Sequence, residues 1–130
     1  MTKDEHIRYW LDSARHDLET AESLFSNQKY DWALFIGHLV IEKALKAHCV
    51  QDSDNKNPPK LHDLVRLAEL TSLNLTEDQK LFLDEVNDFN IEARYPDYKQ
   101  ALYKKCTPDY ARHYFDTIKE FYAWLTSLLR

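Results

Sequence analysis

Apolar residues recur every three to four positions along most of the chain, which is the spacing of amphipathic helices. Thr2 and Glu5 have capping-box spacing, and the apolar series behind them predicts a helix over residues 3–26. A short polar connection at 27–29 follows, so we expect the next helix, over 30–51, to fold back antiparallel to the first. The apolar series of the first helix consists of Trp10, Ala14, Leu18, Ala21, Leu24 and Phe25.

In the predicted helix over residues 30–51, the apolar side chains cover more of the helix surface than a single lengthwise stripe. A helix with this pattern either lies at the centre of a bundle or lines a subunit interface. Gly37, the one glycine of the chain, costs on the order of 1 kcal/mol relative to alanine inside a helix, so we expect it to permit a close helix crossing. His38 beside it is expected to be a hydrogen-bonded core or interface residue.

The second half of the chain contains one evident loop and further helical patterns. Residues 51–60 are polar and include a Pro-Pro pair, which predicts an exposed loop. A short helix is predicted over 61–71 by its apolar spacing. Thr76 and Gln79 then form a capping box, which opens a helix that ends at about Arg94.

Two prolines mark the boundaries of the later helices. Pro96 lacks an N–H and disfavours helical geometry at Tyr95, so the preceding helix should stop there. Thr107 and Pro108 supply an N-cap and a first-turn proline for a last helix that runs to the C-terminus. The predicted fold is all-α: an antiparallel up-and-down four-helix bundle with an additional short helix, forming a single domain over 1–130.

Composition fits this fold class and excludes several others. The one glycine cannot supply a dinucleotide-binding fingerprint or a phosphate-binding P-loop. No apolar run approaches the roughly 20 residues needed to cross a bilayer. The two cysteines lie far apart in no CxxC arrangement, and no secretory leader opens the chain. We therefore expect a reduced, cytoplasmic protein without a membrane span.

The net charge of −5 is distributed unevenly. Residues 1–93 contain 10 basic and 18 acidic side chains, whereas residues 94–130 contain 7 and 4. An acidic chain argues against indiscriminate nucleic-acid binding, while the local basic tract leaves room for a small polyanion or a restricted RNA contact. The six histidines lack metal-ligand spacing, so neither a metal site nor another cofactor is expected.

The helix break near residue 95 brings polar and aromatic side chains together. Arginine is favoured at a helix C-terminus, so capping alone would explain Arg94. The lysines and tyrosines that follow could stack a base and neutralise phosphate, but tyrosines at helical spacing usually pack, and packing is the interpretation we favour for them. These lysines, arginines and tyrosines are Tyr95, Tyr98, Lys99, Tyr103, Lys104, Lys105, Tyr110, Arg112 and Tyr114.

Four segments of the chain, taken in order, resemble segments of one known family. The first segment is the series from Trp10 to Leu24. The second combines Tyr30 to Phe35 with Ile41-Glu42-Lys43-Ala44-Leu45-Lys46-Ala47. The third is Leu61-His62-Asp63-Leu64, and the fourth is Glu92-Ala93-Arg94-Tyr95-Pro96-Asp97-Tyr98. The ordered set spans residues 10–98 and resembles prokaryotic HEPN-domain proteins. The resemblance implies the helical bundle of that family.

Ribonuclease members of the HEPN family use an arginine followed, after four to six residues, by a histidine that does acid–base work. Here Lys99, Gln100 and Ala101 stand where that histidine would follow Arg94, so the cleavage motif is absent. The resemblance carries Arg94 over only as a phosphate-binding candidate. The other ligand-binding candidates that it implies are Tyr95, Asp97, Tyr98, Lys99, Glu42 and Lys46.

The resemblance implies a binding protein more than an enzyme. HEPN proteins commonly occur beside a small nucleotidyltransferase of the MNT type in a two-component, toxin–antitoxin-like system. We therefore expect that partner, a nucleotide or RNA ligand, and a homodimer formed through the helix over 30–51 and its neighbours. Two alternatives stay open: a divergent metal-independent ribonuclease toxin that uses Arg94 with another base, and a purely structural dimeric scaffold. Glu42 and Lys46 also have the spacing of a pair that merely supports a helix.

Overall fold

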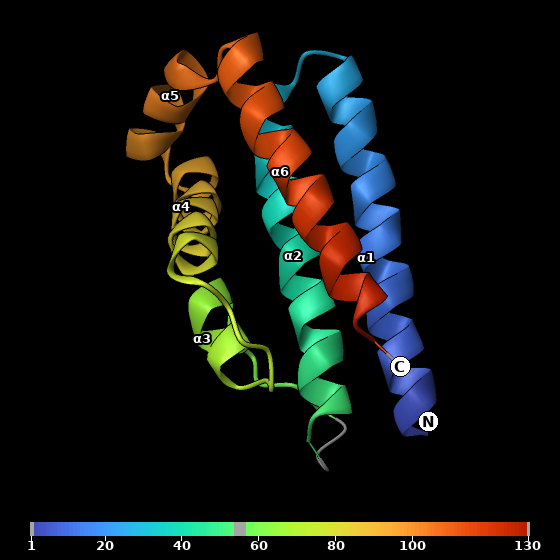
Figure 1. Ribbon diagram of the computed structural model, residues 1–130. Helices are drawn as coiled ribbons and strands as arrows, with labels where there is room; N and C mark the ends of the chain where they lie inside the picture. Colours follow the sequence, from blue (N-terminus) through green and yellow to red (C-terminus); the bar gives the residue numbers. More distant parts are fainter. Residues whose placement is uncertain (1, 54–56, 130) are drawn as a thin grey trace.

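The computed structural model describes residues 2–53 and 57–129, except the side chains of residues 93, 94 and 96–100, and in this range it contains helices and no strand. Six helices follow one another along the chain (Figure 1). They are α1 (Lys3–Ser26), α2 (Tyr30–Gln51), α3 (Leu64–Glu69), α4 (Glu77–Arg94), α5 (Pro96–Lys105) and α6 (Pro108–Ser127). The predicted all-α helical bundle is confirmed.

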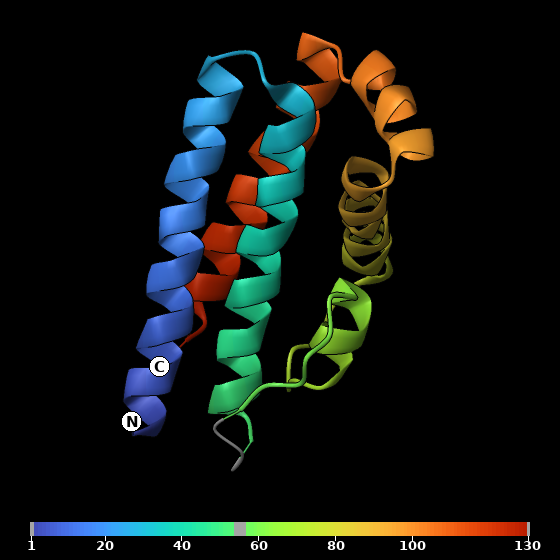
Figure 2. The same cartoon turned by 180° about the vertical axis from the view of Figure 1, so that it is seen from behind.

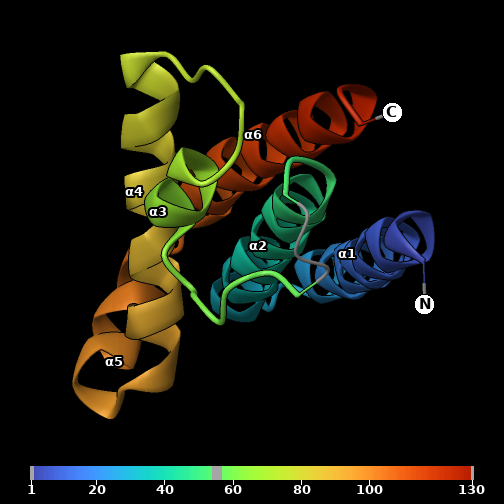
Figure 3. The same ribbon diagram turned by 90° about the horizontal axis from the view of Figure 1, so that it is seen from below.

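Three long helices form the main body of the molecule. α1 and α2 lie side by side and antiparallel, and α6 packs along α2 (Figures 1 and 2). α3, α4 and α5 contact α2 from another side, and α4 is tilted relative to the long helices, as the view from below shows (Figure 3). α2 therefore touches each of the other five helices.

Burial of α2 explains its apolar sequence. Of its 22 residues, 15 are buried within the chain. Buried polar residues of α2 also find partners there: Nε2 of His48 lies 2.8 Å from the Leu125 carbonyl oxygen on α6. The central-helix interpretation accounts for the wide apolar surface, which therefore gives no separate reason to expect a subunit interface.

In the described part of the chain, no helix is long and apolar enough to cross a membrane.

The cysteines belong to the core. Cys49 and Cys106 are free and buried. Burial raises the pKa of the Cys49 thiol to about 11 and that of the Cys106 thiol to about 12. Both side chains are therefore neutral thiols near pH 7, and neither has the depressed pKa of a reactive cysteine.

Side-chain caps fix the starts of α4 and α6 where the sequence predicted them. The Thr76 hydroxyl accepts from Gln79 N at 3.1 Å, and the Gln79 side chain accepts from Thr76 N at 2.8 Å, so the capping box of α4 is complete. Thr107 accepts from Tyr110 N at 3.2 Å and places Pro108 in the first turn of α6. These caps satisfy amides that have no partner inside the helix.

The third helix is shorter than predicted. It spans Leu64–Glu69 and does not start at Leu61, because the Asp63 side chain acts as the N-cap. Its Oδ1 accepts from the backbone N–H groups of Val65 at 3.1 Å and Arg66 at 3.4 Å. Leu61 and His62 therefore belong to the loop that leads into α3.

The fifth helix was not predicted. Pro96 ends α4, as expected, but it is also the first residue of α5, where its missing N–H costs nothing and its fixed φ suits a helix. Leu102, fully buried, anchors α5 to the core. The segment that the sequence interpretation treated as a connection is therefore helical.

Gly37 permits a close approach between α2 and α6. A Cβ atom at this position would lie 2.9 Å from Cδ1 of Ile118, a fully buried side chain of α6. We expect Gly37→Ala to lower the free energy of unfolding by about 1 kcal/mol, because overpacking outweighs the gain in helix propensity. Ile118→Val removes Cδ1 and costs about 0.5–1.5 kcal/mol alone, but it should cost less in the Gly37→Ala background.

A double-mutant cycle measured by urea denaturation checks this crossing. Ile7→Val is the matched control, since Ile7 is buried in a different cluster and its substitution should cost the same in both backgrounds. Equal costs of Ile118→Val with and without Gly37→Ala would contradict the predicted contact.

Candidate functional site

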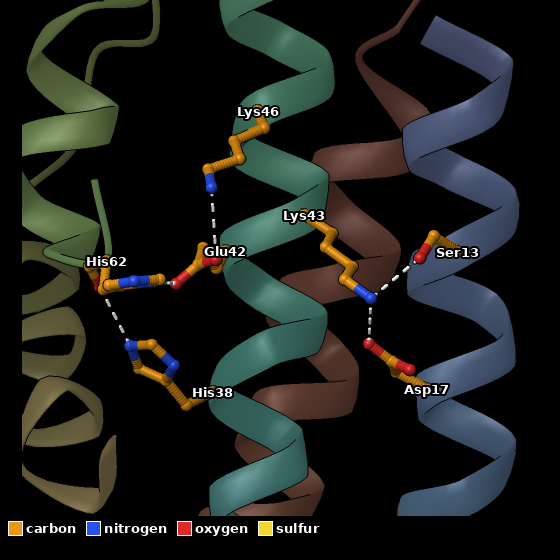
Figure 4. A network of polar contacts seen from close by, with 7 residues as sticks. All are labelled: Ser13, Asp17, His38, Glu42, Lys43, Lys46 and His62. Carbon is orange, nitrogen blue, oxygen red and sulfur yellow. Dashed lines mark hydrogen bonds and ion pairs between the residues drawn. The ribbon is translucent and has the colours of Figure 1, made fainter. Parts of the chain in front are cut away.

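Three polar residues lie on the face of α2 that is directed toward α3: His38, Glu42 and Lys46 (Figure 4). Their spacing of four residues places them above one another on one side of the helix. All three are buried, with exposed fractions of 0%, 4% and 7%. Buried charges are unfavourable unless they are paired and hydrogen-bonded, so each of these side chains requires a partner inside the protein.

Glu42 is the centre of this group. Nδ1 of His62 lies 2.9 Å from Oε1 of Glu42, and Nζ of Lys46 lies 3.3 Å from its Oε2. Nζ of Lys46 also lies 5.3 Å from the ring centre of Trp10 on α1, a distance typical of a cation–π contact. The carboxylate thus pairs with two groups, and Lys46 is stabilised by both α1 and its own helix.

His62 is held by its backbone as well as its side chain. Nε2 of His38 donates a hydrogen bond of 3.0 Å to the His62 carbonyl oxygen (Figure 4). The next residue, Asp63, accepts a hydrogen bond of 2.9 Å from the Asn87 side chain on α4. The loop before α3 is therefore fixed to α2 on one side and to α4 on the other.

The imidazole of His62 has a defined orientation. Its side chain is 55% exposed, although its partner Glu42 is buried. A histidine that donates Nδ1–H to a carboxylate presents Nε2 to its surroundings as a hydrogen-bond acceptor. The arrangement can bind a hydrogen-bond donor or accept a proton.

A second ion pair lies on the opposite side of α2, toward α1. Nζ of Lys43 lies 2.6 Å from Oδ2 of Asp17 and donates to the Ser13 hydroxyl at 2.7 Å. These contacts are separate from the Glu42 group (Figure 4). Lys43 therefore ties α1 to α2, and its charge is used within the fold.

A hollow of about 300 Å³ lies beside His62, between α4 and the loop that leads into α3. It extends along α4 as far as Ile91, about one helical turn before Arg94 at the end of the helix. The polar and charged residues that line it are His62, Asp63, Asp84, Asn87, Asp88 and Asn90. His62 thus opens onto a polar groove that runs toward the helix break.

The break between α4 and α5 is the second candidate region. Tyr95 adopts an extended conformation (φ −103°, ψ 126°) between Arg94, the last residue of α4, and Pro96, the first of α5. Tyr95 is 57% exposed. The side chains of Arg94, Asp97, Tyr98 and Lys99 lie outside the described residues, so their assignment as ligand-binding residues stays a prediction.

The tyrosines near the break divide into exposed and packed residues. Tyr103 of α5 is 70% exposed, and the lysines that follow it, Lys104 and Lys105, are exposed in the last turn. Lys105 is engaged, since its Nζ lies 3.1 Å from Oε1 of Glu92. Tyr95 and Tyr103 are therefore the described tyrosines of this region that a ligand could reach.

Tyr110 and Tyr114 of α6 pack as the favoured interpretation expected. Their ring centres lie 4.8 Å apart, and both contact the main core. A hydrogen bond of 2.6 Å from the Tyr114 hydroxyl to Glu85 raises the pKa of Tyr114, and burial raises the pKa of Tyr110 to about 12. Both side chains remain neutral phenols that stabilise the α4–α6 contact.

Sequence reasoning paired Glu42 with Lys46 but missed His62. It treated His62 as a first-turn residue of a helix, whereas the structure places it one residue before the N-cap Asp63 and in contact with Glu42. The Leu-His-Asp-Leu segment was the available signal, because a cap aspartate identifies its neighbour as a loop residue. Which residue of α2 this histidine contacts depends on the path of the loop.

Comparison with known proteins assigns the family. The HEPN domain profile matches residues 7–128. The chain belongs to the HEPN-domain family. HEPN domains often dimerise. The resemblance inferred from the ordered segments is confirmed at the level of the family, while the part assigned to Arg94 and its neighbours stays a prediction.

A solved structure has the same fold as this HEPN protein. The crystal structure of TT1696 from Thermus thermophilus superposes with a TM-score of 0.80, covers 95% of this chain and 98% of that chain, and is 24% identical in sequence. At this identity the similarity establishes the fold alone. No curated protein matches the chain with significance.

Among the described residues, no three His, Cys, Asp or Glu side chains are arranged to hold a metal ion.

The Glu42 pair has a measurable consequence for stability. We expect Glu42→Leu to lower the free energy of unfolding by about 3 kcal/mol or more, because Lys46 stays buried without its carboxylate. The double variant Glu42→Leu/Lys46→Met removes that charge and should recover most of the loss. Urea denaturation at neutral pH measures both values.

The control for this prediction is an exposed pair. Asp12 and Arg15 lie 3.5 Å apart with side chains 60% and 68% exposed, so Asp12→Leu should change stability by about 0.5 kcal/mol or less. A loss in Glu42→Leu no larger than in Asp12→Leu, or no recovery in the double variant, would contradict the prediction.

Proposed function

We propose that this HEPN protein binds a nucleotide or a short RNA segment at the break between α4 and α5, and that it is the non-catalytic partner of an MNT-type nucleotidyltransferase. The supporting observation is the break itself, where the chain leaves the helical conformation at the exposed Tyr95 and directly enters a new helix. An exposed aromatic ring beside an arginine in the sequence is a suitable combination for stacking a base and binding its phosphate.

Charge favours an anionic ligand in this part of the chain. Residues 94–130 carry 7 basic and 4 acidic side chains, although the whole chain is acidic. The amides in the first turn of α5 have no partners within the helix, and the positive end of its dipole lies at the same break. In this proposal, Arg94 and Lys99 contact phosphate, while Tyr95 or Tyr98 stacks on a base.

The proposal assigns no cleavage to this site. None of positions 99–101, where the motif places its histidine after Arg94, is a histidine, and lysine, the residue type at position 99, is ordinarily a poor proton acceptor. The nucleotidyltransferase partner, the two-component context and a homodimer rest on the family. In that arrangement Glu42 and Lys46 act indirectly, by holding His62 at the groove that leads to the break.

Nucleotide titration tests the proposal directly. We expect Arg94→Ala to weaken binding of nucleotides or short RNA by about 1–3 kcal/mol, because a charge-assisted contact is lost. Tyr95→Ala should weaken binding by a similar amount through lost stacking, about 1–3 kcal/mol per base. Calorimetric titration with a panel of nucleotides, at two salt concentrations, measures these changes.

The matched control is Tyr9→Ala, since Tyr9 is 55% exposed and lies on α1. It should leave binding unchanged. If the wild type binds no nucleotide or RNA and Arg94→Ala lowers only the melting temperature, then Arg94 is a helix cap and the scaffold alternative gains support.

The orientation of His62 favours one second candidate, a divergent ribonuclease. A histidine oriented by a buried carboxylate can act as a general base, which is the group that the arginine motif lacks. We nevertheless expect no cleavage of structured or single-stranded RNA by the purified protein. Cleavage that is lost in His62→Gln and retained in the control His113→Gln, an exposed histidine of α6, would favour the enzyme instead.

A further inference from the structure

The outer face of α3 and α4 exposes apolar side chains that no other part of the described chain covers. Leu81 is 61% exposed and Ile91 is 47% exposed, and both are on α4, while Leu70 at the end of α3 is 50% exposed. Exposed large apolar residues that cluster on one face indicate an interaction surface more often than single scattered ones do.

The exposed residues of α4 follow the spacing of a helix-pairing seam. Positions 77, 81, 84, 88 and 91 are separated by alternating steps of four and three, and Leu81 and Ile91 occupy two of them. Residues at these steps form one narrow stripe along a helix, which is the geometry that a second helix packs against. The remaining members of the stripe are Glu77, Asp84 and Asp88.

This stripe borders a continuous concave surface. Hollows of about 200, 360 and 300 Å³ follow one another beside α4; the first two are also lined by residues of α3, and the third by the loop residues His62 and Asp63. The first two share Val65 and Lys80, and the last two share Asp63 and Asp84. The apolar residues that line these hollows are Val65, Ala68, Leu73, Leu75, Leu81 and Ile91.

The acidic side chains of this surface indicate what kind of partner it can bind. Asp63, Glu77, Asp84 and Asp88 line the second and third hollows. Among the described residues that line these two hollows, Lys80 is the one basic side chain besides His62, and its Nζ lies 3.5 Å from Glu77. A second copy of the chain would oppose carboxylates with carboxylates, which is unfavourable, whereas lysine or arginine side chains would complement them.

We propose that the α3–α4 face docks an amphipathic helix of a partner protein, with apolar side chains at alternating three- and four-residue spacing and flanking lysine or arginine residues. Leu81 and Ile91 are the apolar anchors toward the two ends of the stripe, and the long lysine or arginine side chains at the partner's flanking positions reach in to Asp84 and Asp88 between them. This inference rests on the part of the proposed function that expects a protein partner. It does not require nucleotide binding at the α4–α5 break.

A synthetic peptide of about three heptads, with leucine at the seam and lysine at the flanking positions, is the probe. We expect the wild-type protein to bind it in fluorescence anisotropy, with Leu81→Ala weakening binding about tenfold. The variant Asp84→Lys/Asp88→Lys should weaken it at least about tenfold, and the difference should shrink as salt is added. These side chains are exposed, so circular dichroism should show unchanged folding.

Matched controls separate docking from general charge attraction. Glu19→Lys/Glu120→Lys makes the same change in net charge on exposed positions of α1 and α6, and Leu128→Ala shortens an exposed leucine that is 42% exposed. Both should change binding by about twofold or less. A peptide of equal composition with the leucine spacing scrambled should bind at least about tenfold more weakly, because it forms no continuous seam.

Three results would overturn the inference: no binding of the peptide by the wild type, equal binding of the scrambled peptide, or equal weakening by the Glu19 and Glu120 control. Sedimentation provides a fourth, since a dimer that dissociates in Leu81→Ala would assign the face to a second copy. If the wild type binds the peptide but no nucleotide, only the proposed nucleotide site is contradicted. If it binds nucleotide but not the peptide, only the proposed docking face is contradicted.

Discussion

The burial of α2 is the constraint on which the rest of the structure depends. Because this helix contacts all five others, a polar side chain buried on it is costly unless it finds a partner within the protein. His48 pairs with the carbonyl of Leu125, and His38 and Glu42 both pair with His62. A carboxylate at the centre of the bundle thereby fixes a loop at its surface, so the stability of the core and the geometry of the candidate site are linked.

The residues that hold the candidate site in position are therefore different from the residues that a ligand can contact. Glu42 and Lys46 are 4% and 7% exposed, so their charges are largely satisfied inside the fold. The groups that a ligand or partner can reach are His62 at the groove, Tyr95 at the helix break, and the apolar and acidic stripe of α4. The buried residues hold the candidate site in position, whereas the exposed residues are the ones that can contact a ligand or a partner.

Local sequence signals predicted most of the fold correctly. The capping box at Thr76 and the Thr107–Pro108 pair both start helices where expected, because a cap depends only on residues within one turn. The errors also have local causes. Asp63 stops α3 from starting at Leu61, and Pro96, which was interpreted only as the end of a helix, also begins the next one. Proline fits both situations, so its presence alone does not decide between them; in the structure the segment after it is a helix whose Leu102 is buried in the core.

The sequence by itself determined the helical class and the absence of the arginine–histidine cleavage motif, since these depend on periodicity and on spacing along the chain, while the family follows from the match of residues 7–128 to the HEPN domain profile. Only the tertiary structure decided that the apolar width of α2 is used within the chain and that His62 meets Glu42 across 20 positions of sequence. It also decided that Tyr110 and Tyr114 are packed while Tyr103 is exposed. The physical reason is that burial and pairing depend on how helices cross and where a loop runs, which no local pattern encodes.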